Sequence, residues 1–289
     1  MPLILITGAD GQLGSEIKIA ARKYYGYDFI FTDINDLDIT SSEDVSRFIV
    51  ENRPDWIVNC AAWNNVDKAE SEPGAAMLVN SFAVKNISEA IAGSDKSFIH
   101  ISSDYVFDGS SALPYTENDN TEPGTEYGRS KLAGEKAALM HNRAMVIRTS
   151  WLYSAYGNNF VKTILRKAKE TDHLRVVFDQ AGTPTWAADL AETIMNIISS
   201  VIRNRVAFNA GIYHFSNEGV CSWYDLAIAI IEEAGLSCGI QPIRSAEFAS
   251  AAMRPAYSVL DKTKIKENYN IEIAHWRSSL KKCIKQISP

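Results

Sequence analysis

The most constraining feature of the sequence is a glycine-rich turn that directly follows its first apolar run. Leu3–Ile6 is continuously apolar, and the next eight residues, Thr7-Gly8-Ala9-Asp10-Gly11-Gln12-Leu13-Gly14, carry glycine at every third position. Glycines allow a tight turn and a close approach of the backbone to a pyrophosphate, and the N-terminus of the following helix offers amide donors to the phosphates. We therefore predict a strand, a turn and a helix that bind a dinucleotide, with Gly8 and Gly11 in the turn.

Four further apolar runs recur along the first half of the chain, at Phe29–Phe31, Trp56–Val58, Phe98–Ile101 and Met145–Ile147. Their hydrophobicity is continuous, which is typical of strands buried on both faces of a parallel sheet. Helical patterns separate the runs, and the longest spans residues 76–91. Such alternation indicates right-handed βαβ units. We predict an α/β fold with a Rossmann-type doubly wound parallel sheet.

The pattern changes after Thr149, where Gly157 and Asn158-Asn159 interrupt the chain. Helices are predicted near 160–169, over 187–202 and 224–234, and at 276–287, with strands near 176–178 and 212–215. This mixture favours a smaller mixed α/β substrate domain. We predict a dinucleotide-binding domain over residues 1–150 and a mainly substrate-binding domain over 151–289, some of whose elements are free to return to the first sheet.

Composition excludes several classes of protein. The net charge of −6 argues against a protein that follows nucleic-acid phosphates. No segment reaches the roughly 18 apolar residues of a membrane span, so no membrane partner is expected. The five histidines show no metal-ligand spacing, and no metal is predicted. The widely spaced cysteines form neither a disulfide framework nor a zinc ribbon and suit a reducing cytosol, so we expect a cytoplasmic protein; they are Cys60, Cys221, Cys238 and Cys283.

Asp33 ends the second predicted strand, about 20 residues after the glycine turn, where a carboxylate accepts hydrogen bonds from an adenosine ribose. No Arg or Lys lies between Asp28 and Ser46 that would bind a 2′-phosphate. The sequence therefore favours NADH over NADPH. The alternative interpretation is a turn-forming Asp at a strand end without a ligand.

Tyr127 and Lys131 form a Y-x-x-x-K pattern at the start of a predicted helix over residues 131–140. Positions i and i+4 of a helix share a face, and an ammonium beside a phenol lowers the phenol pKa. The tyrosine then becomes a proton donor and acceptor near neutral pH. A surface helix pair is the alternative.

Ser102-Ser103-Asp104 ends the strand predicted over Phe98–Ile101. Ligands of open α/β sheets bind at the carboxyl ends of strands, so a hydroxyl here is placed to polarise a carbonyl. The alternative is a serine that only terminates the strand.

Several longer stretches of the sequence indicate a protein family. Together with the glycine turn and Tyr127-Gly128-Arg129-Ser130-Lys131, they resemble the dTDP-4-dehydrorhamnose reductase family of the extended short-chain dehydrogenase/reductase superfamily, from residue 3 to about residue 260. The strings are Asn59-Cys60-Ala61-Ala62, Val66-Asp67-Lys68-Ala69-Glu70, Ser103-Asp104-Tyr105-Val106-Phe107-Asp108-Gly109, Arg148-Thr149-Ser150-Trp151-Leu152-Tyr153, Gly157-Asn158-Asn159-Phe160, Asp179-Gln180-Ala181-Gly182-Thr183-Pro184-Thr185 and Arg254-Pro255. They are specific only jointly.

The resemblance implies an oxidoreductase that reduces the C4 ketone of dTDP-4-dehydro-β-L-rhamnose to dTDP-L-rhamnose with NADH or NADPH. It also implies the cofactor contacts, in three groups. These are Gly11, Gln12 and Leu13 at the pyrophosphate, Asp33, Asp38 and Ile39 on the adenosine side, and Ala61, Ala62 and Trp63 beneath the nicotinamide half.

The same resemblance implies the catalytic roles. Tyr127 would protonate the ketone oxygen, and Lys131 would hold the nicotinamide ribose and lower the pKa of Tyr127. Ser103 would hydrogen-bond the sugar oxygen, with Asp104 beside it. On the substrate side, Trp151 would pack near the sugar nucleotide. Arg254 would contact the diphosphate, and the alternative for Arg254 is a structural salt bridge.

Two positions depart from the family pattern. The family often has Thr where this chain has Ser103, and the hydroxyl is retained. It often has a His-Thr pair where this chain has Trp63-Asn64, which leaves the nicotinamide-side contacts open.

Two other functions stay open. A nucleotide-sugar 4,6-dehydratase or epimerase would keep the scaffold, but dehydratases of this kind usually carry an Asp-Glu pair and here Asp104 is followed by Tyr105. Reduction of a neighbouring 4-keto sugar is not excluded. A regulatory subunit resembling that of methionine adenosyltransferase would bind the dinucleotide without turnover. The sequence does not determine the oligomeric state, and a homodimer is one expectation.

Overall fold

A computed structural model describes residues 1–287, so the last two residues of the predicted 151–289 unit lie outside the described part. Its main sheet has six strands in the order β10-β5-β4-β3-β1-β2, all paired in parallel. The strands are β1 (Leu3–Thr7), β2 (Asp28–Thr32), β3 (Trp56–Asn59), β4 (Ser97–Ser103), β5 (Ala144–Thr149) and β10 (Gly211–His214). The predicted doubly wound α/β fold is confirmed.

The strand order reverses between β1 and β3, because the chain moves from β1 outward to β2 and then returns to β3 on the other side. Ligands of such sheets bind beyond the carboxyl ends of the strands at this switch point. Every residue of β3 and β5 is buried, as their continuous hydrophobicity predicts.

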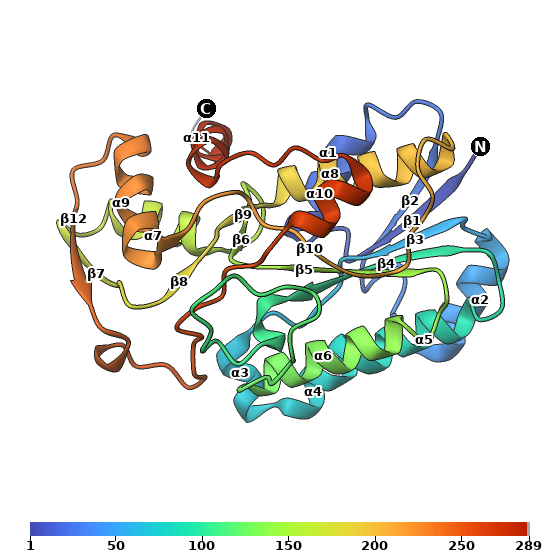
Figure 1. The fold of residues 1–289 in the computed structure, drawn as a ribbon, viewed down its shortest axis with the longest axis horizontal. Coiled ribbons are helices and arrows are strands. Elements are labelled where there is room, and N and C mark those ends of the chain that lie inside the picture. Colours follow the sequence, from blue (N-terminus) through green and yellow to red (C-terminus); the bar gives the residue numbers. More distant parts are fainter. Residues whose placement is uncertain (288–289) are drawn as a thin grey trace.

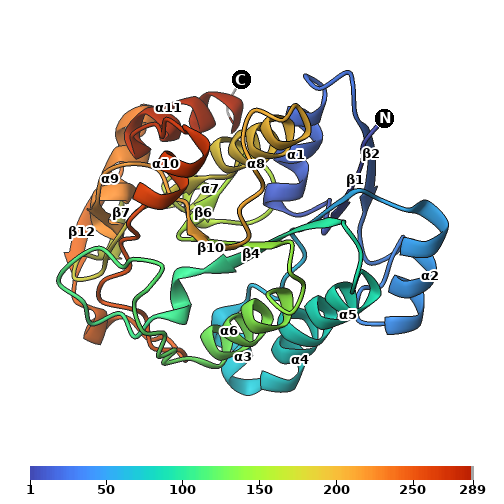
Figure 2. The ribbon, with the colours of Figure 1, turned by 45° about the vertical axis from the view of Figure 1, so that its right-hand side comes forward.

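Helices cover both faces of the sheet (Figures 1 and 2). On one face lie α1 (Gln12–Ala21), α8 (Ala187–Ile202) and α10 (Thr263–Tyr269), which share a core with inward residues of β1, β3 and β5. On the other face lie α2 (Ser42–Asn52), α5 (Ala83–Ala90) and α6 (Glu126–Ala138) around a second core. The Ser41 side chain caps α2 by accepting from Asp44 N.

The helical pattern over residues 76–91 is not one uninterrupted α-helix. After α3 (Val66–Ser71), the chain forms α4 (Pro73–Met77), a π-helical turn η1 (Leu78–Phe82) and then α5. A π-helical turn carries an extra residue relative to an α-helix and occurs most often at functional sites. It displaces the helix register at Asn80, which is fully buried.

The segment after residue 150 builds a separate hydrophobic cluster around Tyr153, Leu226, Trp276 and Leu280. It contains three two-stranded sheets, β11-β8, β12-β7 and β6-β9. Its elements are β6 (Leu152–Tyr153), α7 (Phe160–Lys167), β7 (His173–Val177), β8 (Ala181–Gly182), β9 (Thr185–Trp186), β11 (Cys221–Ser222), α9 (Trp223–Ala234), β12 (Gly239–Ile243) and α11 (Trp276–Ile287).

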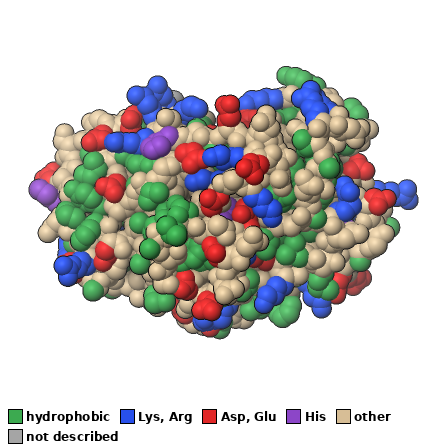
Figure 3. Space-filling model, in the orientation of Figure 1, with side chains coloured by type: hydrophobic (Ala, Val, Ile, Leu, Met, Phe, Trp, Pro, Cys, Tyr) green, Lys and Arg blue, Asp and Glu red, His purple; other side chains and the backbone are tan. Residues whose placement is uncertain are grey.

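Three later elements, β10, α8 and α10, belong to the main sheet and its helical layer. The strand β10 pairs with β5 at the sheet edge, and α8 packs against α1. Figure 1 shows α7, α9, β7 and β12 grouped at one end of the molecule, away from β1 and β2. Figure 3 shows hydrophobic side chains gathered over that end of this face, whereas acidic and basic side chains are interspersed over the remainder.

Candidate active site

The glycine turn follows β1 and is fixed by two close backbone approaches. Gly8 has a φ of +66°, and a Cβ placed on it would lie 2.5 Å from the Ala61 Cα atom. A Cβ on Gly14 would lie 2.4 Å from the Gly8 carbonyl oxygen. No larger side chain fits either position, so the first and third glycines bring β1, β3 and α1 together.

The middle glycine leaves space for a ligand. A Cβ on Gly11 would meet only the Gly8 oxygen, at 3.2 Å. Gly11 is the N-cap of α1, with no side-chain capping bond and no acidic residue in the first turn. The N-terminal amides of α1 are therefore not engaged by a capping side chain, and the helix dipole favours an anion there. These residues fit the pyrophosphate of a dinucleotide.

Gln12 and Leu13 differ in what their side chains can do. The Gln12 Oε1 atom accepts a hydrogen bond of 2.9 Å from Asn159 Nδ2, which connects the glycine turn to the loop before α7. The Leu13 side chain is buried in the core beneath α1. Only the backbone of Leu13 is placed for a pyrophosphate contact.

Asp33 directly follows β2 and is tied to the glycine turn. Its Oδ2 atom accepts from Asp10 N at 3.0 Å, and its Oδ1 atom accepts from Ile34 N at 2.8 Å. Lys18 of α1 lies nearby, 2.7 Å from the Asp10 carboxylate and over the Phe31 ring. The stretch between Asp28 and Ser46 holds no basic residue, but Lys18 comes from another element and supplies one on this side of the turn.

Asp38 and Ile39 lie in the turn before α2. The Asp38 carboxylate accepts from the backbone N–H of Thr40 at 2.9 Å, and the Ile39 side chain is buried in the core beneath α2. Asn86 of α5 donates to the Ile39 carbonyl at 3.0 Å. This fixes the turn, and the assignment of Asp38 and Ile39 to the adenosine side stays a prediction.

The loop Ala61–Trp63 follows β3 and is held by a residue that sequence reasoning missed. Asn80 of η1 accepts from Trp63 N at 2.9 Å and donates to Trp63 O at 3.0 Å. Its amide also donates to the hydroxyl of Ser130 on α6 at 2.9 Å. One buried side chain therefore connects this loop to the helix that carries Tyr127. The π-helical register that places Asn80 has no clear sequence signal.

Tyr127 and Lys131 both lie on α6, which begins at Glu126 rather than at the predicted residue 131 because Thr125 caps it by accepting from Gly128 N. The Lys131 Nζ atom donates to the Ile101 carbonyl of β4 at 2.7 Å. Burial lowers the pKa of Lys131 to about 8.

Lys131 does not lower the pKa of Tyr127 in this structure, contrary to the expectation from the sequence. Burial raises the pKa of Tyr127 above its ordinary value, and only the Ser103 hydroxyl acts in the opposite direction. The reason is desolvation: Tyr127 is 7% exposed, and a buried phenolate is unfavourable. Tyr127 is therefore a protonated phenol near neutral pH, which suits a proton donor.

Ser103 and Asp104 lie where β4 ends and a short 3₁₀ turn, η2 (Asp104–Val106), begins. The Ser103 hydroxyl lies 2.9 Å from Asp104 Oδ1 and accepts from Tyr105 N at 3.2 Å. The Tyr105 ring meets the Tyr127 ring edge to face, with 5.4 Å between centroids. These contacts group Ser103, Asp104 and Tyr127, and their catalytic roles stay predictions.

Trp151 lies beyond β5, whose residue Thr149 is paired in register with Ser103. Its φ of +48° is in the left-handed region, which is uncommon for a bulky residue and marks strain held by the surrounding structure. Its ring contacts Gly182 of β8, where a Cβ would lie 2.6 Å from Trp151 Cε2. The ring stacks on Trp223, a residue that sequence reasoning did not single out.

Arg254 forms a salt bridge in this structure. Its Nη2 atom lies 2.6 Å from Asp67 Oδ2, and its Nη1 atom lies 3.2 Å from the Tyr105 hydroxyl. Asp67 also accepts from Ala252 N at 3.0 Å. The structure thus shows the salt-bridge alternative, while a contact from Arg254 to a diphosphate stays a prediction.

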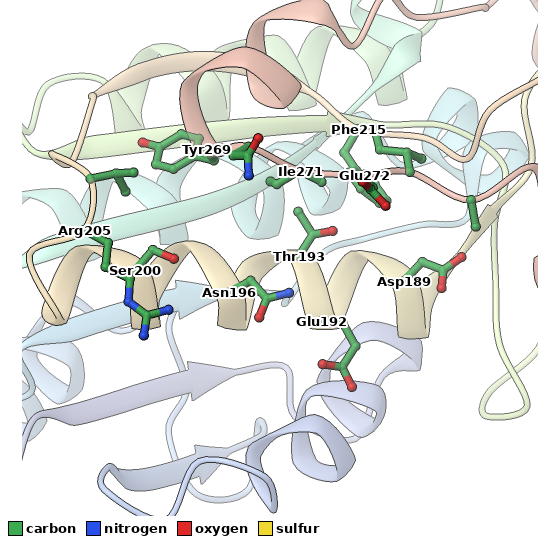
Figure 4. A pocket seen from close by; sticks show the side chains of 14 residues that line it. Asp189, Glu192, Thr193, Asn196, Ser200, Arg205, Phe215, Tyr269, Ile271 and Glu272 are labelled. Carbon is green, nitrogen blue, oxygen red and sulfur yellow. The ribbon is translucent and has the colours of Figure 1, made fainter.

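A separate cavity of about 750 Å³ lies between α8 and the segment that follows α10, and it contains none of the predicted site residues. Figure 4 shows Asn196 and Thr193 of α8 facing Tyr269 and Ile271. Within residues 1–287, no three His, Cys, Asp or Glu side chains are grouped to hold a metal ion. In the same part of the chain, no helix combines the length and apolar character needed to cross a membrane.

Comparison with known proteins agrees with this geometry. The family model "RmlD substrate binding domain" matches residues 1–288. A dTDP-4-dehydrorhamnose reductase from Aggregatibacter actinomycetemcomitans is 40% identical over 97% of this chain and 98% of the relative.

Two solved structures share the fold across the whole chain. The dTDP-4-dehydrorhamnose reductase of Clostridium acetobutylicum gives a TM-score of 0.92 at 39% identity, with 99% of this chain and 100% of that chain covered. The Bacillus anthracis enzyme of the same name, in complex with NADP, gives a TM-score of 0.92 at 37% identity with the same coverage. The chain therefore belongs to the RmlD substrate binding domain family, the family of the dTDP-4-dehydrorhamnose reductases.

Proposed function

We propose that the chain reduces the C4 ketone of dTDP-4-dehydro-β-L-rhamnose to dTDP-L-rhamnose with NADH or NADPH. The observation that carries the proposal is the grouping of Tyr127, Ser103 and Lys131 at the carboxyl end of β4. This group lies at the same sheet edge as the glycine turn. Family membership across residues 1–288 supports the substrate class.

The bound nicotinamide supplies the hydride. Tyr127 donates its phenolic proton to the ketone oxygen as negative charge develops there. Ser103 hydrogen-bonds the same oxygen and stabilises this charge. Lys131 is held at its ammonium group by the Ile101 carbonyl and holds the nicotinamide ribose.

The binding roles of the remaining residues follow the sequence assignments. Gly8, Gly11 and the N-terminus of α1 bind the pyrophosphate. Asp33 binds the adenosine ribose, and its two backbone donors orient the carboxylate for this role. The segment from residue 151 onward binds the sugar nucleotide, and its own hydrophobic cluster supports treating it as a second unit.

Trp151 contributes to the sugar-nucleotide pocket. Arg254 exchanges its Asp67 partner for the substrate diphosphate. The four free cysteines support a cytoplasmic location. We keep the homodimer as an expectation, which sedimentation of the purified chain tests directly.

Turnover distinguishes this function from that of a regulatory dinucleotide-binding subunit. Purified protein should be assayed for NADH or NADPH oxidation with each member of a panel of 4-keto dTDP sugars. We expect oxidation with dTDP-4-dehydro-β-L-rhamnose, and NMR should identify dTDP-L-rhamnose as the product. Tyr127→Phe should lower kcat by roughly 10²–10⁴-fold while cofactor affinity stays nearly intact, because the change removes only the proton donor. Tyr25→Phe, at a tyrosine that is 93% exposed, is the matched control. A Tyr127→Phe variant with wild-type turnover would show the mechanism to be wrong.

A further inference from the structure

The carboxyl group of Asp104 lies in contact with the Ser103 hydroxyl in an environment closed to solvent. The two oxygens, Ser103 Oγ and Asp104 Oδ1, are 2.9 Å apart. Asp104 is 3% exposed and Ser103 is 6% exposed. At this distance and burial, a proton lies between the two oxygens and comes from one of them.

The direction of the hydrogen bond between Ser103 and Asp104 depends on the charge of Asp104. A serine hydroxyl has one proton and two acceptor lone pairs, and an ionised carboxylate only accepts. When Asp104 is ionised, Ser103 must therefore donate its single proton to Asp104. That proton is then not available to a ketone oxygen.

A neutral Asp104 reverses this direction. Its own carboxyl proton is donated to Ser103 Oγ, which also accepts from Tyr105 N at 3.2 Å. Both lone pairs of the hydroxyl are then used, and the Ser103 proton is directed away from Asp104, towards the side where Tyr127 lies. Only this form makes Ser103 a donor to the substrate.

The second oxygen of Asp104 also favours the neutral form. Asp104 Oδ2 is buried, and no hydrogen bond of acceptable geometry reaches it within residues 1–287, although the Ser258 hydroxyl lies close enough to lower the pKa of Asp104. An ionised carboxylate that leaves one buried oxygen without a donor is strongly unfavourable, whereas a neutral carboxyl loses much less on burial.

We propose that Asp104 works in its neutral form, as a positioning residue that donates to Ser103 and thereby releases the Ser103 proton for the ketone oxygen. This inference rests on the proposed function, because it needs a substrate carbonyl at Ser103. It assigns Asp104 a role through Ser103 rather than a direct contact with the sugar.

The electrostatic surroundings agree with a carboxyl group that is neutral in slightly acidic solution. Burial raises the pKa of Asp104 to about 6, and the hydroxyls of Ser103 and Ser258 act in the opposite direction. Tyr105 on the same turn and Tyr127 on α6 face Asp104, and its charge raises the pKa of both phenols.

Other charged groups around this turn titrate in different ranges. Burial lowers the pKa of Lys131 to about 8 and raises that of Tyr105 to about 12. Asp67 and Arg254 pair with each other and reach the turn through the Tyr105 hydroxyl. Loss of activity as the pH rises through about 6 therefore reports Asp104, and a change near pH 8 reports Lys131.

The first test is the pH dependence of kcat/KM between pH 5 and 9. For the wild type we expect a fall of about tenfold per pH unit above pH 6, until a plateau is reached. Asp104→Asn should be a few-fold less active than the wild type at pH 5.5, because an amide donates more weakly than a carboxylic acid. It should lack the fall near pH 6 and exceed the wild type above pH 7.5, because an amide donates to Ser103 at every pH.

Two further variants complete the comparison. Asp104→Ala offers Ser103 neither an acceptor nor a donor, so it should lack the fall near pH 6, but it should be less active than Asp104→Asn because the Ser103 hydroxyl is no longer held in one orientation. Asp119→Asn, at an exposed carboxylate that accepts from Thr116 N, is the control and should keep the wild-type profile. A wild-type profile that is flat from pH 5 to 7.5, or an Asp104→Asn variant that retains the fall, overturns the inference.

The second test needs no substrate. Carbon-13 NMR of the chain labelled at its Asp carboxyl carbons should show one carboxyl that titrates near pH 6 and is absent from the Asp104 variants. Ser103→Ala should shift this titration to higher pH, because it removes the donor to the ionised form. An Asp104 signal that titrates near pH 4 overturns the inference. Failure of the proposed function is a different result, namely that the wild type oxidises no cofactor with any 4-keto sugar at any pH.

Discussion

Trp151 and Trp223 stack face to face, with ring centroids 3.6 Å apart and planes 9° from parallel. The contact joins the second residue after β5 to the first residue of α9. Phe160 of α7 packs on the Trp223 ring at 4.7 Å. Trp223 thus supports Trp151 in its left-handed backbone conformation, and the pair connects the end of the main sheet to the second hydrophobic cluster.

Replacing either tryptophan should therefore weaken binding of the sugar nucleotide. An aromatic pair contributes about 0.5–1.5 kcal/mol beyond its buried area, which corresponds to roughly a two- to tenfold change in affinity. Trp151→Ala and Trp223→Ala should each raise the sugar-nucleotide KM by at least this factor, with NADH affinity nearly unchanged. Trp223→Phe should restore part of the loss. Equal losses for the sugar nucleotide and NADH would show that the pair supports only the fold.

Asn80 provides a second prediction, because its single side chain satisfies both backbone groups of Trp63. Asn80→Ala leaves these groups without their partners, at a cost of about 1–3 kcal/mol for each one that stays buried. We expect a lower midpoint of urea unfolding and a raised KM for NADH, since the loop beneath the nicotinamide loses its support. Asn268→Ala, which removes a contact to the Tyr213 hydroxyl instead, serves as the comparison. The role fails if both variants change the NADH KM equally.

Cofactor preference should depend on Asp33 and Lys18 in opposite ways. The Asp33 carboxylate repels a 2′-phosphate and accepts from a free 2′-hydroxyl, so Asp33→Ala should narrow any preference for NADH over NADPH. Lys18 lies beside Asp10 and Phe31 on the same side of the turn, so Lys18→Ala should weaken NADPH more than NADH. Specificity constants for both cofactors decide the point. An unchanged ratio in Asp33→Ala would remove Asp33 from the ribose site.

Asp104 should also make stability depend on pH. Its pKa in the folded chain is about 6 against an ordinary 3.8, so the folded state binds the proton more tightly than the unfolded state. The contribution of Asp104 to the stability of the wild type is therefore fully present below about pH 4. It is lost as the pH rises from about 4 to 6. One pKa unit corresponds to about 1.4 kcal/mol, so the loss is about 3 kcal/mol.

Asp104→Asn does not ionise and should escape this loss. Urea unfolding at pH 7.5 should show the variant more stable than the wild type, and the difference should fall to about 1 kcal/mol as the pH falls to 4.5. Asp119→Asn provides the baseline for a carboxylate on the surface. A gain of equal size at both pH values would mean that the variant acts through packing rather than through charge.

The amino-acid pattern alone predicts the buried strands of a parallel sheet and the positions of the main motifs. Continuous apolar runs identify buried parallel strands, and the Gly8, Gly11 and Gly14 spacing identifies the turn, because both depend on contacts that are short in sequence. Tyr127 and Lys131 were placed on one helix for the same reason. The strings from residue 3 to about residue 260 were sufficient to indicate the family that the comparisons confirm.

The pKa values and contact partners of these residues depend on how distant elements pack in the folded chain. Whether Lys131 lowers the pKa of Tyr127 depends on burial and on the Ile101 carbonyl, and the sequence carries no measure of either. Asn80 and Trp223 act through contacts with Trp63 and Trp151, which are far from them in the chain. Hydrophobic periodicity indicates which face of an element is buried. The partner of a buried polar group, in contrast, is fixed only when distant elements pack together. The reason is that the free-energy cost of leaving such a group unpaired arises only in the folded interior.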